Sequence, residues 1–240
     1  MIFAAGLGTR MKPLTNNIPK ALVPINGVPL LELVIRRLIH FDIKDIIINV
    51  HYMAEQIEFF LEKNNNFGIN IVISDEKEKV LETGGGLKKA QHFFDDGQPF
   101  LLCNTDILCD INIFNLQKKH LENKAIATLA VQDRKTSRYF LFNKKMELCG
   151  WKNVKTEQIK TARETEDALT MLAFSSFQIL EPRIFDFMPA DKDVFSNVDF
   201  FLKVAETEII KAYVHDANWL DVGTPENIPQ AEVFLKRIDF

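Results

Sequence analysis

Cysteine, tryptophan and tyrosine are scarce in this chain, which has three, two and three copies of them among its 240 residues. The cysteines are Cys103, Cys109 and Cys149, an odd number with no C-x-x-C spacing. That pattern argues against a disulfide framework and against a zinc site, and it favours a reducing compartment. Cys103 and Cys109 flank apolar positions, so we expect small buried side chains there rather than nucleophiles.

An excess of positive charge is missing as well. Lys and Arg total 29 against 33 Asp and Glu, which leaves a formal net charge of −4. A protein whose main partner is nucleic acid needs a basic stripe to neutralise the phosphate backbone, so this class is excluded. A single nucleotide is a different case, because a few cations, backbone amides and a metal ion can converge on it locally.

Long hydrophobic runs are also absent. The longest fall well short of the roughly 20 residues that a helix needs to span a bilayer, and the N-terminus carries no cationic leader. We therefore expect a cytoplasmic protein with no membrane partner. The composition leaves open whether it is a monomer or a small homo-oligomer.

Short β-branched runs alternate with amphipathic stretches in the first half of the chain. The pattern predicts buried strands over 45–50, 69–74 and 100–104, with helices over 29–41, around 57–61 and over 87–94. Strand and helix in alternation favour an α/β fold with a mostly parallel sheet covered by helices on both faces.

The second half of the chain is richer in strand patterns. We expect strands over 125–131, 138–142 and 168–177 with charged turns between them, including 152–167, then a helix over 198–205 and a strand over 209–214. A last helix is predicted from Thr224 as its N-cap and Pro225 at its first position. No repeat or linker interrupts the chain, so one domain over 1–240 is expected, with two halves at about 1–124 and about 125–240.

The first predicted strand, over 1–4, runs straight into a glycine-rich loop, Ala5-Gly6-Leu7-Gly8-Thr9-Arg10. Glycines let a backbone approach an anion closely, and successive N–H groups can form a nest for phosphate oxygens. The dinucleotide fingerprint would need a glycine where Met11 stands, and a Walker loop would need Gly-Lys-Ser/Thr at its end. Both of these familiar nucleotide loops are therefore excluded.

The residues that follow carry a longer pattern. The run G-x-G-T-R-M-x-P-L-T-x-x-x-P-K-x-L-V-P, from Gly6 to Pro24, resembles the sugar-1-phosphate nucleotidyltransferase (nucleotide-sugar pyrophosphorylase) family. The resemblance implies a single-domain, three-layer α/β/α, Rossmann-like mixed sheet, with the nucleotide bound by the half at about 1–124 and the sugar by the half at about 125–240. It also implies that Arg10 and Lys20 stabilise the triphosphate and the leaving pyrophosphate, with the nucleotide on the loop at Ala5, Gly6, Gly8 and Thr9. Both roles are chemically sensible, since phosphoryl-type transfer depends on positioning and charge neutralisation.

A second glycine cluster and two aspartates extend the resemblance. The segment Glu82-Thr83-Gly84-Gly85-Gly86 is similar to the family's base-reading segment, in the form found in uridylyltransferases that act on N-acetylmuramic acid 1-phosphate. Asp106 follows a predicted strand and matches the family's metal-binding aspartate, and Asp221 in W-L-D-V-G-T matches the second. Two carboxylates with phosphate oxygens and water suit Mg²⁺.

Some positions depart from the family or are matched only by place. Thr105 and Ser176 stand where relatives have glycine, which puts the space beside the metal and the identity of the sugar in question. Asn104 and Glu166 are assigned to the sugar by position. The first strand is expected to be short, or the start codon to be assigned late, because Met1 already lies inside it, and a short strand would anchor the loop weakly.

The resemblance implies one reaction: attack by a sugar 1-phosphate on the α-phosphorus of a nucleoside triphosphate, UTP favoured, with release of pyrophosphate. Alternatives within this chemistry are a mannose 1-phosphate guanylyltransferase, a glucose 1-phosphate thymidylyltransferase and a phosphocholine cytidylyltransferase. A silent nucleotide-sugar sensor is the alternative from another class. Such a sensor should have lost charge at Arg10, Lys20, Asp106 and Asp221, all of which this chain keeps.

Overall fold

A computed structural model of the chain describes residues 1–236. These residues form two compact units, each assembled from separate pieces of the sequence. The first unit holds residues 1–81, 103–110 and 218 onward, and the second holds 82–102 and 111–217. The prediction of one domain with halves meeting near residue 124 stays a prediction.

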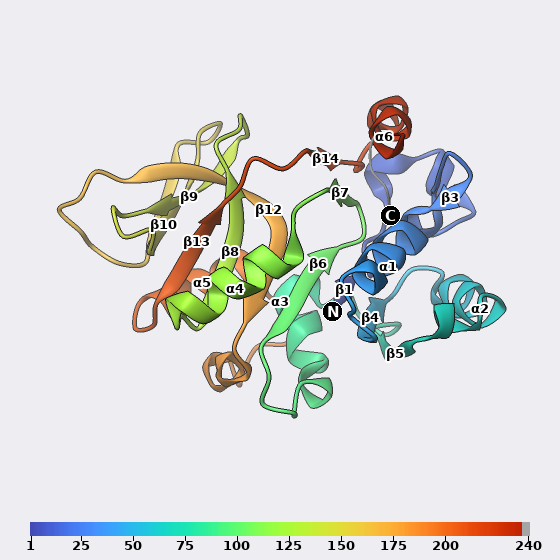
Figure 1. The fold of residues 1–240 in the computed structure, drawn as a ribbon, viewed down its shortest axis with the longest axis horizontal. Helices are drawn as coiled ribbons and strands as arrows, with labels where there is room; N and C mark the ends of the chain where they lie inside the picture. Colours follow the sequence, from blue (N-terminus) through green and yellow to red (C-terminus); the bar gives the residue numbers. More distant parts are fainter. Residues whose placement is uncertain (237–240) are drawn as a thin grey trace. The chain divides into compact units, whose positions relative to one another are not determined.

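Parallel strands form the centre of the first unit. Strand β1 (Ile2–Phe3) lies between β4 (Asp45–Val50) and the end of β6 (Phe100–Asn104), and β5 (Asn70–Asp75) follows on the far side of β4 (Figure 1). All of these pairs are parallel. Five consecutive residues of β4 are buried, as expected for a strand covered on both faces.

Two helices and two short ladders complete this unit. Helix α1 (Leu30–His40) buries its leucine-rich face and holds an i,i+4 ion pair of 2.7 Å between Glu32 and Arg36; α2 (Ala54–Lys63) follows β4. Strands β2 (Pro24–Ile25) and β3 (Val28–Pro29) form a hairpin, and β7 (Ile107–Cys109) pairs antiparallel with β14 (Trp219–Asp221). An apolar cluster joins β2, α1, β7 and the last helix, α6 (Ile228–Leu235); it contains Met11, Val23, Ile25, Leu30, Leu33, Leu108, Val222 and Ala231.

The second unit is mainly antiparallel. Its strands are β8 (Ala127–Gln132), β9 (Arg138–Phe142), β10 (Leu148–Asn153), β11 (Gln158–Thr161), β12 (Thr170–Leu180) and β13 (Ile210–Val214). They run in the order β11, β10, β9, β12, β8, β13, and only the last pair is parallel. Helices α3 (Glu82–Lys89), α4 (Ile113–Asn123) and α5 (Asn197–Ala205) belong to this unit.

The predicted α/β class with a mixed sheet and flanking helices is confirmed. Strands 45–50 and 100–104 have the predicted bounds. The charged segment 152–167 was wrongly predicted as a turn throughout, because it contains β11 and the end of β10. Among the described residues, strand β11 pairs only with β10 and is largely exposed, so its composition lacks the apolar signal of a buried strand.

The start of the last helix also differs from the prediction. Thr224 and Pro225 begin a 3₁₀ turn over Pro225–Asn227, and α6 itself begins at Ile228. Thr224 has the extended backbone of a cap, but its side chain makes no capping hydrogen bond to the turn's backbone. The predicted cap is therefore wrong by one turn, which is a common error where a helix opens with a 3₁₀ turn.

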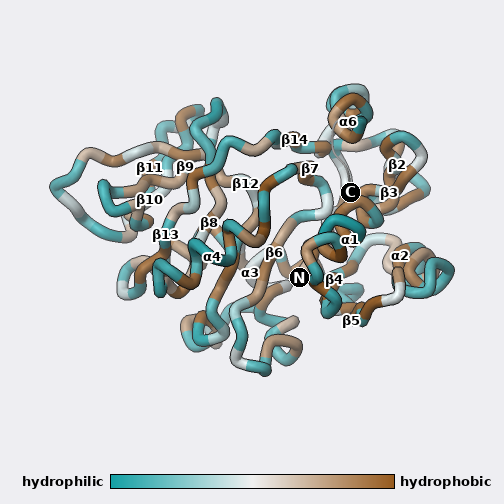
Figure 2. The backbone as a smooth tube through the Cα atoms, viewed as in Figure 1, coloured by the Kyte–Doolittle hydropathy of each residue, from teal (hydrophilic) through white to brown (hydrophobic). Residues whose placement is uncertain are grey.

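Hydrophobic residues are concentrated in strands such as β4 and β5, whereas many connecting loops are hydrophilic (Figure 2). Cys103 and Cys109 are buried, as expected, and Cys149 is buried as well. Burial raises the pKa of Cys103 to about 11. Over residues 1–236, none of the helices combines the length and apolar character that a membrane span requires.

Candidate functional site

The glycine-rich loop that follows β1 contains several backbone N–H groups that have no backbone acceptor among the described residues. Gly6 and Leu7 are exposed. Among the residues that the structure describes, the N–H groups of Gly6, Leu7 and Gly8 donate to no backbone acceptor, and the first internal bond runs from Met11 N–H to Gly8 O at 2.9 Å. A run of free N–H groups on an exposed loop is the arrangement expected of an anion nest.

Gly8 and Thr15 hold the shape of this loop. Gly8 has φ +64°, the left-handed region that favours glycine, and the Thr15 hydroxyl donates to Gly8 O at 2.7 Å. Thr15 is fully buried. Thr15, the second threonine of the sequence pattern, therefore holds the loop in its conformation, a role that the sequence did not predict.

Lys20 and Asp106 meet although 86 residues separate them. Lys20 lies in a 3₁₀ turn after the loop, and its ammonium group forms an ion pair with Asp106 Oδ2. Asp106 follows β6, in the turn before β7. Their side chains are 14% and 22% exposed, so the pair is reachable from solvent.

The β7–β14 ladder brings Asp221 to the same place. Asp221 pairs with Ile107, the neighbour of Asp106, and Val222 N–H donates to Asp106 O at 2.8 Å. A Cβ added to Gly223 would lie 2.5 Å from Asp221 Oδ1 and 2.9 Å from a guanidinium nitrogen of Arg10. Arg10, Lys20, Asp106 and Asp221, four residues predicted for the reaction centre, are thus gathered within the first unit.

Asp221 is the member of this group whose surroundings disfavour the ionised carboxylate. Burial raises the pKa of its carboxyl, the charge of Asp106 adds to the rise, and Lys20, Arg10 and the backbone N–H of Gly223 oppose it. Its Oδ1 is buried and accepts no hydrogen bond within the described part of the chain. A buried carboxylate oxygen without a partner, beside a second carboxylate, fits the ligand set of a hard divalent cation.

The second glycine cluster lies in the other unit and makes different contacts. The N–H groups of Gly84 and Gly85 both donate to Phe195 O, at 2.9 and 3.2 Å, and a Cβ on Gly84 would lie 2.3 Å from the Phe195 ring. The Thr83 hydroxyl accepts from Asn197 N–H at 2.9 Å, at the start of α5. The close approach that these glycines permit is therefore to Phe195. Their assignment to the nucleotide, with exposed Glu82, rests on the family resemblance alone.

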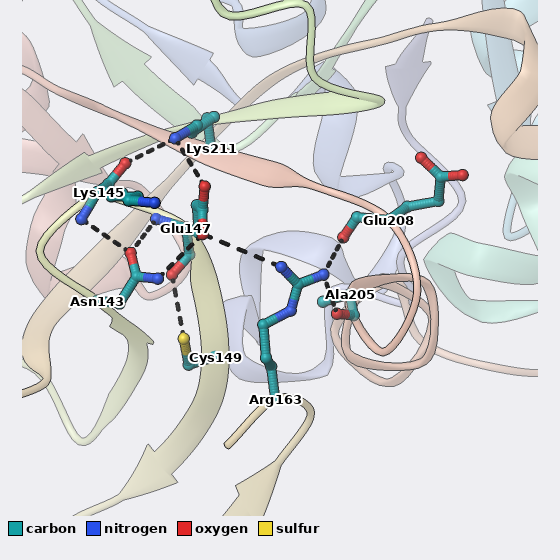
Figure 3. A network of polar contacts seen from close by, with 8 residues as sticks. All are labelled: Asn143, Lys145, Glu147, Cys149, Arg163, Ala205, Glu208 and Lys211. Atoms are coloured by element: carbon teal, nitrogen blue, oxygen red, sulfur yellow. Dashed lines mark hydrogen bonds and ion pairs between the residues drawn. The ribbon is translucent and has the colours of Figure 1, made fainter. Parts of the chain in front are cut away.

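Glu166 is an exposed loop residue between β11 and β12. Three residues earlier, Arg163 anchors this loop by donating to Ala205 O and Glu208 O, each at 3.1 Å, and lies 4.0 Å from Glu147 (Figure 3). Glu147 also accepts from Lys211 and Asn143; burial opposes its ionisation, but these hydrogen bonds prevail and lower its pKa. The network fixes the root of the loop, and the sugar assignment of Glu166 stays a prediction.

The remaining predicted positions lie on strand ends. Asn104 is the last residue of β6, opposite Phe3, and is half-buried. Thr105, one of the two expected departures from the family pattern, is buried and donates its hydroxyl to Phe3 O at 2.6 Å. Ser176 has φ +64° within a register shift of β12, so it adopts a backbone conformation that favours glycine, the residue that the resemblance led us to expect there.

Two buried polar residues of the first unit, Asn49 and Glu76, were not predicted from the sequence. Asn49, near the end of β4, accepts from Ala4 N–H at 2.8 Å, and its amide donates to Glu76 at 2.7 Å. Both are buried, at 3% and 1% exposure. The available signal was Asn49 itself, a polar residue in an isoleucine run that reads as a buried strand.

Comparison with known proteins identifies the family of the chain. The profile of the family described as Nucleotidyl transferase matches residues 1–237. A UTP–glucose-1-phosphate uridylyltransferase of Synechocystis sp. is 32% identical over 96% of this chain and 61% of its own length. An N-acetylmuramate alpha-1-phosphate uridylyltransferase of Caulobacter vibrioides is 44% identical over 108 residues, 44% of each chain. The chain thus spans less than two thirds of the length of either relative.

Solved structures show the same fold. The crystal structure of HddC from Yersinia pseudotuberculosis complexed with GMP-PN has a TM-score of 0.77 and 25% identity over 98% of this chain and 97% of its own. The loop, the paired cations and the paired aspartates all lie inside the profile match. With nearly its whole length covered by that profile, the chain belongs to the nucleotidyl transferase family.

Proposed function

We propose that the protein transfers a nucleotidyl group from a nucleoside triphosphate to a sugar 1-phosphate, forming a nucleotide sugar and pyrophosphate. One observation carries the proposal. Two cations and two carboxylates from three distant stretches of sequence, Arg10 with Lys20, Asp106 and Asp221, meet beside a loop with free N–H groups. A site of this composition suits a polyphosphate with its metal ion.

The chain's own groups have distinct roles in this proposal. The loop N–H groups bind phosphate oxygens, and Arg10, which is exposed, forks onto the departing pyrophosphate. Lys20 neutralises Asp106 in the free chain and lies where it can share its donors with a phosphate. The nucleophile is already an anion at neutral pH, so the reaction needs no general base.

Asp106 and Asp221 are the residues that would hold Mg²⁺. When bound, the ion supplies charge neutralisation for the reacting phosphates. Asn104 and Glu166 stay candidates for the sugar and Glu82, Thr83, Gly84 and Gly85 for the nucleotide, all by resemblance.

UTP is the favoured nucleotide, with an amino sugar 1-phosphate as acceptor. The support is the E-T-G-G-G segment and the 44% identity to the Caulobacter uridylyltransferase over 108 residues. The HddC structure, complexed with a guanine nucleotide analogue, keeps guanine as an alternative. We further propose a cytoplasmic location and a monomer or small homo-oligomer.

A pyrophosphate-release assay tests the reaction, with UTP, GTP, CTP, ATP and dTTP each paired with several sugar 1-phosphates and Mg²⁺. We expect turnover with at least one pair and its loss in Asp106→Ala. Asp45→Asn is the matched control, since Asp45 is an exposed aspartate of the same unit whose side chain accepts from Asn70 at 2.9 Å. Near-normal turnover in Asp106→Ala would contradict the proposal, and binding without turnover for every pair would favour the sensor.

A further inference from the structure

A chain of side-chain hydrogen bonds links the carboxyl ends of three parallel strands in the first unit. Ala4 N–H, just after β1, donates to Asn49 Oδ1 at 2.8 Å. Asn49 Nδ2 donates to Glu76 Oε1 at 2.7 Å, and Leu81 N–H donates to Glu76 Oε2 at 3.1 Å. Asn49 is the last residue but one of β4, and Glu76 directly follows β5.

The two ends of this chain are both backbone donors. Ala4 stands at the root of the glycine-rich loop, and Leu81 directly precedes Glu82. An amide side chain accepts a hydrogen bond through its oxygen and donates one through its nitrogen. Two amide side chains in series could therefore not accept from a backbone N–H at each end of the network. One member must accept on both sides, and the Glu76 carboxylate does so. This also fixes the orientation of the Asn49 amide, because Ala4 needs its oxygen and Glu76 its nitrogen.

Because Asn49 and Glu76 are buried, each donor in this network needs an acceptor within the protein. Asn49 and Glu76 are 3% and 1% exposed, so water cannot replace a lost partner. The strand β1 is only two residues long, and the Asn49 side chain supplies the acceptor for the first N–H beyond it. The Glu76 backbone is held as well, with its N–H on Val50 O at 2.8 Å and its carbonyl 2.7 Å from His51 Nδ1.

We propose that Asn49 and Glu76 are positioning residues for nucleotide binding. By fixing the backbone at Ala4, they set the position of the phosphate-binding loop relative to the sheet, and by fixing Leu81 they set the backbone that enters the second glycine segment. This inference rests on the proposed function. It replaces the expectation that so short a first strand anchors the loop weakly.

The test exchanges the two functional groups. In Glu76→Gln, one buried donor is left facing an amide NH₂, and we expect the KM for the nucleotide to rise by about tenfold or more, with the KM for the sugar 1-phosphate nearly unchanged. In the double variant Asn49→Asp with Glu76→Gln, the new carboxylate at position 49 accepts from Ala4 and from the new amide at position 76. The oxygen of that amide accepts from Leu81. All directions are restored, so the nucleotide KM should return to within about threefold of the wild type.

Glu78→Gln is the matched control, because Glu78 is exposed, lies on the same turn and loses the same charge. The inference is overturned if Glu76→Gln keeps the wild-type nucleotide KM, if both substrate KM values rise together with the loss of thermal stability, or if the exchange restores nothing. If the wild type binds Mg²⁺-nucleotide but shows no turnover, the transferase proposal fails, and the same variants are compared by nucleotide Kd. A wild type that binds no nucleotide overturns both.

Discussion

Asp221 shows at the level of one residue how a proposed metal ligand can oppose folding. Burial and the Asp106 charge raise its pKa above the usual 3.8, and Lys20 and Arg10 compensate only in part. A folded-state pKa above the unfolded value means that the native state holds this proton more tightly. The charged form therefore destabilises the fold above the folded-state pKa, and the penalty disappears as the pH falls through it.

Asp221→Asn keeps the shape of the side chain and removes this charge. In the presence of a chelator at neutral pH, we expect the free energy of unfolding to increase by about 0.5–2 kcal/mol, while pyrophosphate release is lost. The gain should shrink as the pH is lowered. Urea unfolding at several pH values measures this, with Asp45→Asn as the neutral reference. A variant less stable than the wild type would mean that Asp221 is a structural residue.

Ser176 is a second residue at which a substitution is expected to stabilise the fold, because its backbone conformation favours glycine. Its φ of +64° lies in the left-handed region, which costs an L-residue roughly 1–2 kcal/mol. Ser176→Gly should therefore stabilise the protein by about 0.5–1 kcal/mol after the entropy of glycine is subtracted. The neighbouring Ser175→Gly is the control: Ser175 is fully buried and its hydroxyl lies 3.0 Å from His215 Nε2, so stability should fall. The melting temperatures of the two variants, compared with that of the wild type, test this prediction. Equal shifts in the two variants would exclude backbone strain at Ser176 as the cause.

The glycine-rich loop is the element in which fold and function can be separated. A Cβ on Gly8 would lie 3.0 Å from Thr15 and 3.1 Å from Lys20 at a positive φ, whereas a Cβ on Gly6 would have no atom of the described residues within 4 Å. The fold therefore requires glycine at position 8 and not at position 6. Under the proposed function, close approach of a phosphate would explain the glycine at position 6.

Gly6→Ala should leave thermal stability within about 0.5 kcal/mol of the wild type and raise the nucleotide KM by about tenfold, because the added methyl group faces the phosphates. Gly8→Ala should lower stability by about 1–2 kcal/mol through backbone strain. Differential scanning fluorimetry and substrate titration separate the two effects. An unchanged KM in Gly6→Ala would show that the phosphates do not approach the loop there.

Ligand binding provides a test at the scale of the whole molecule. Asp106 is engaged by Lys20, and Asp221 Oδ1 has no hydrogen-bond partner within residues 1–236, so a metal ion by itself meets an incomplete ligand set. We expect Mg²⁺ with UTP to raise the melting temperature, by the equivalent of about 2.7 kcal/mol at a hundredfold excess over Kd. Either ligand given separately should produce a smaller shift, and Asp106→Ala should abolish the combined one. Equal shifts with UTP alone would remove the two aspartates from the nucleotide complex.

Much of this protein could be predicted from local sequence, because local signals depend on near neighbours in the chain. Three consecutive isoleucines and a valine mark β4 wherever it packs, and Gly8 signals a positive φ wherever the loop lies. The order of Arg10, Lys20, Asp106 and Asp221 within the family pattern identified the group that the structure then brings together.

Partners across long separations were decided only by the tertiary structure. Nothing near Asn49 indicates that Glu76, 27 residues later, will supply the acceptor that its amide needs. Similarly, Phe195 occupies the N–H groups of Gly84 and Gly85 that the sequence pattern offered to a ligand. A hydrogen bond is set by which buried donors and acceptors packing brings within about 3 Å of one another, and residue order alone does not contain that information.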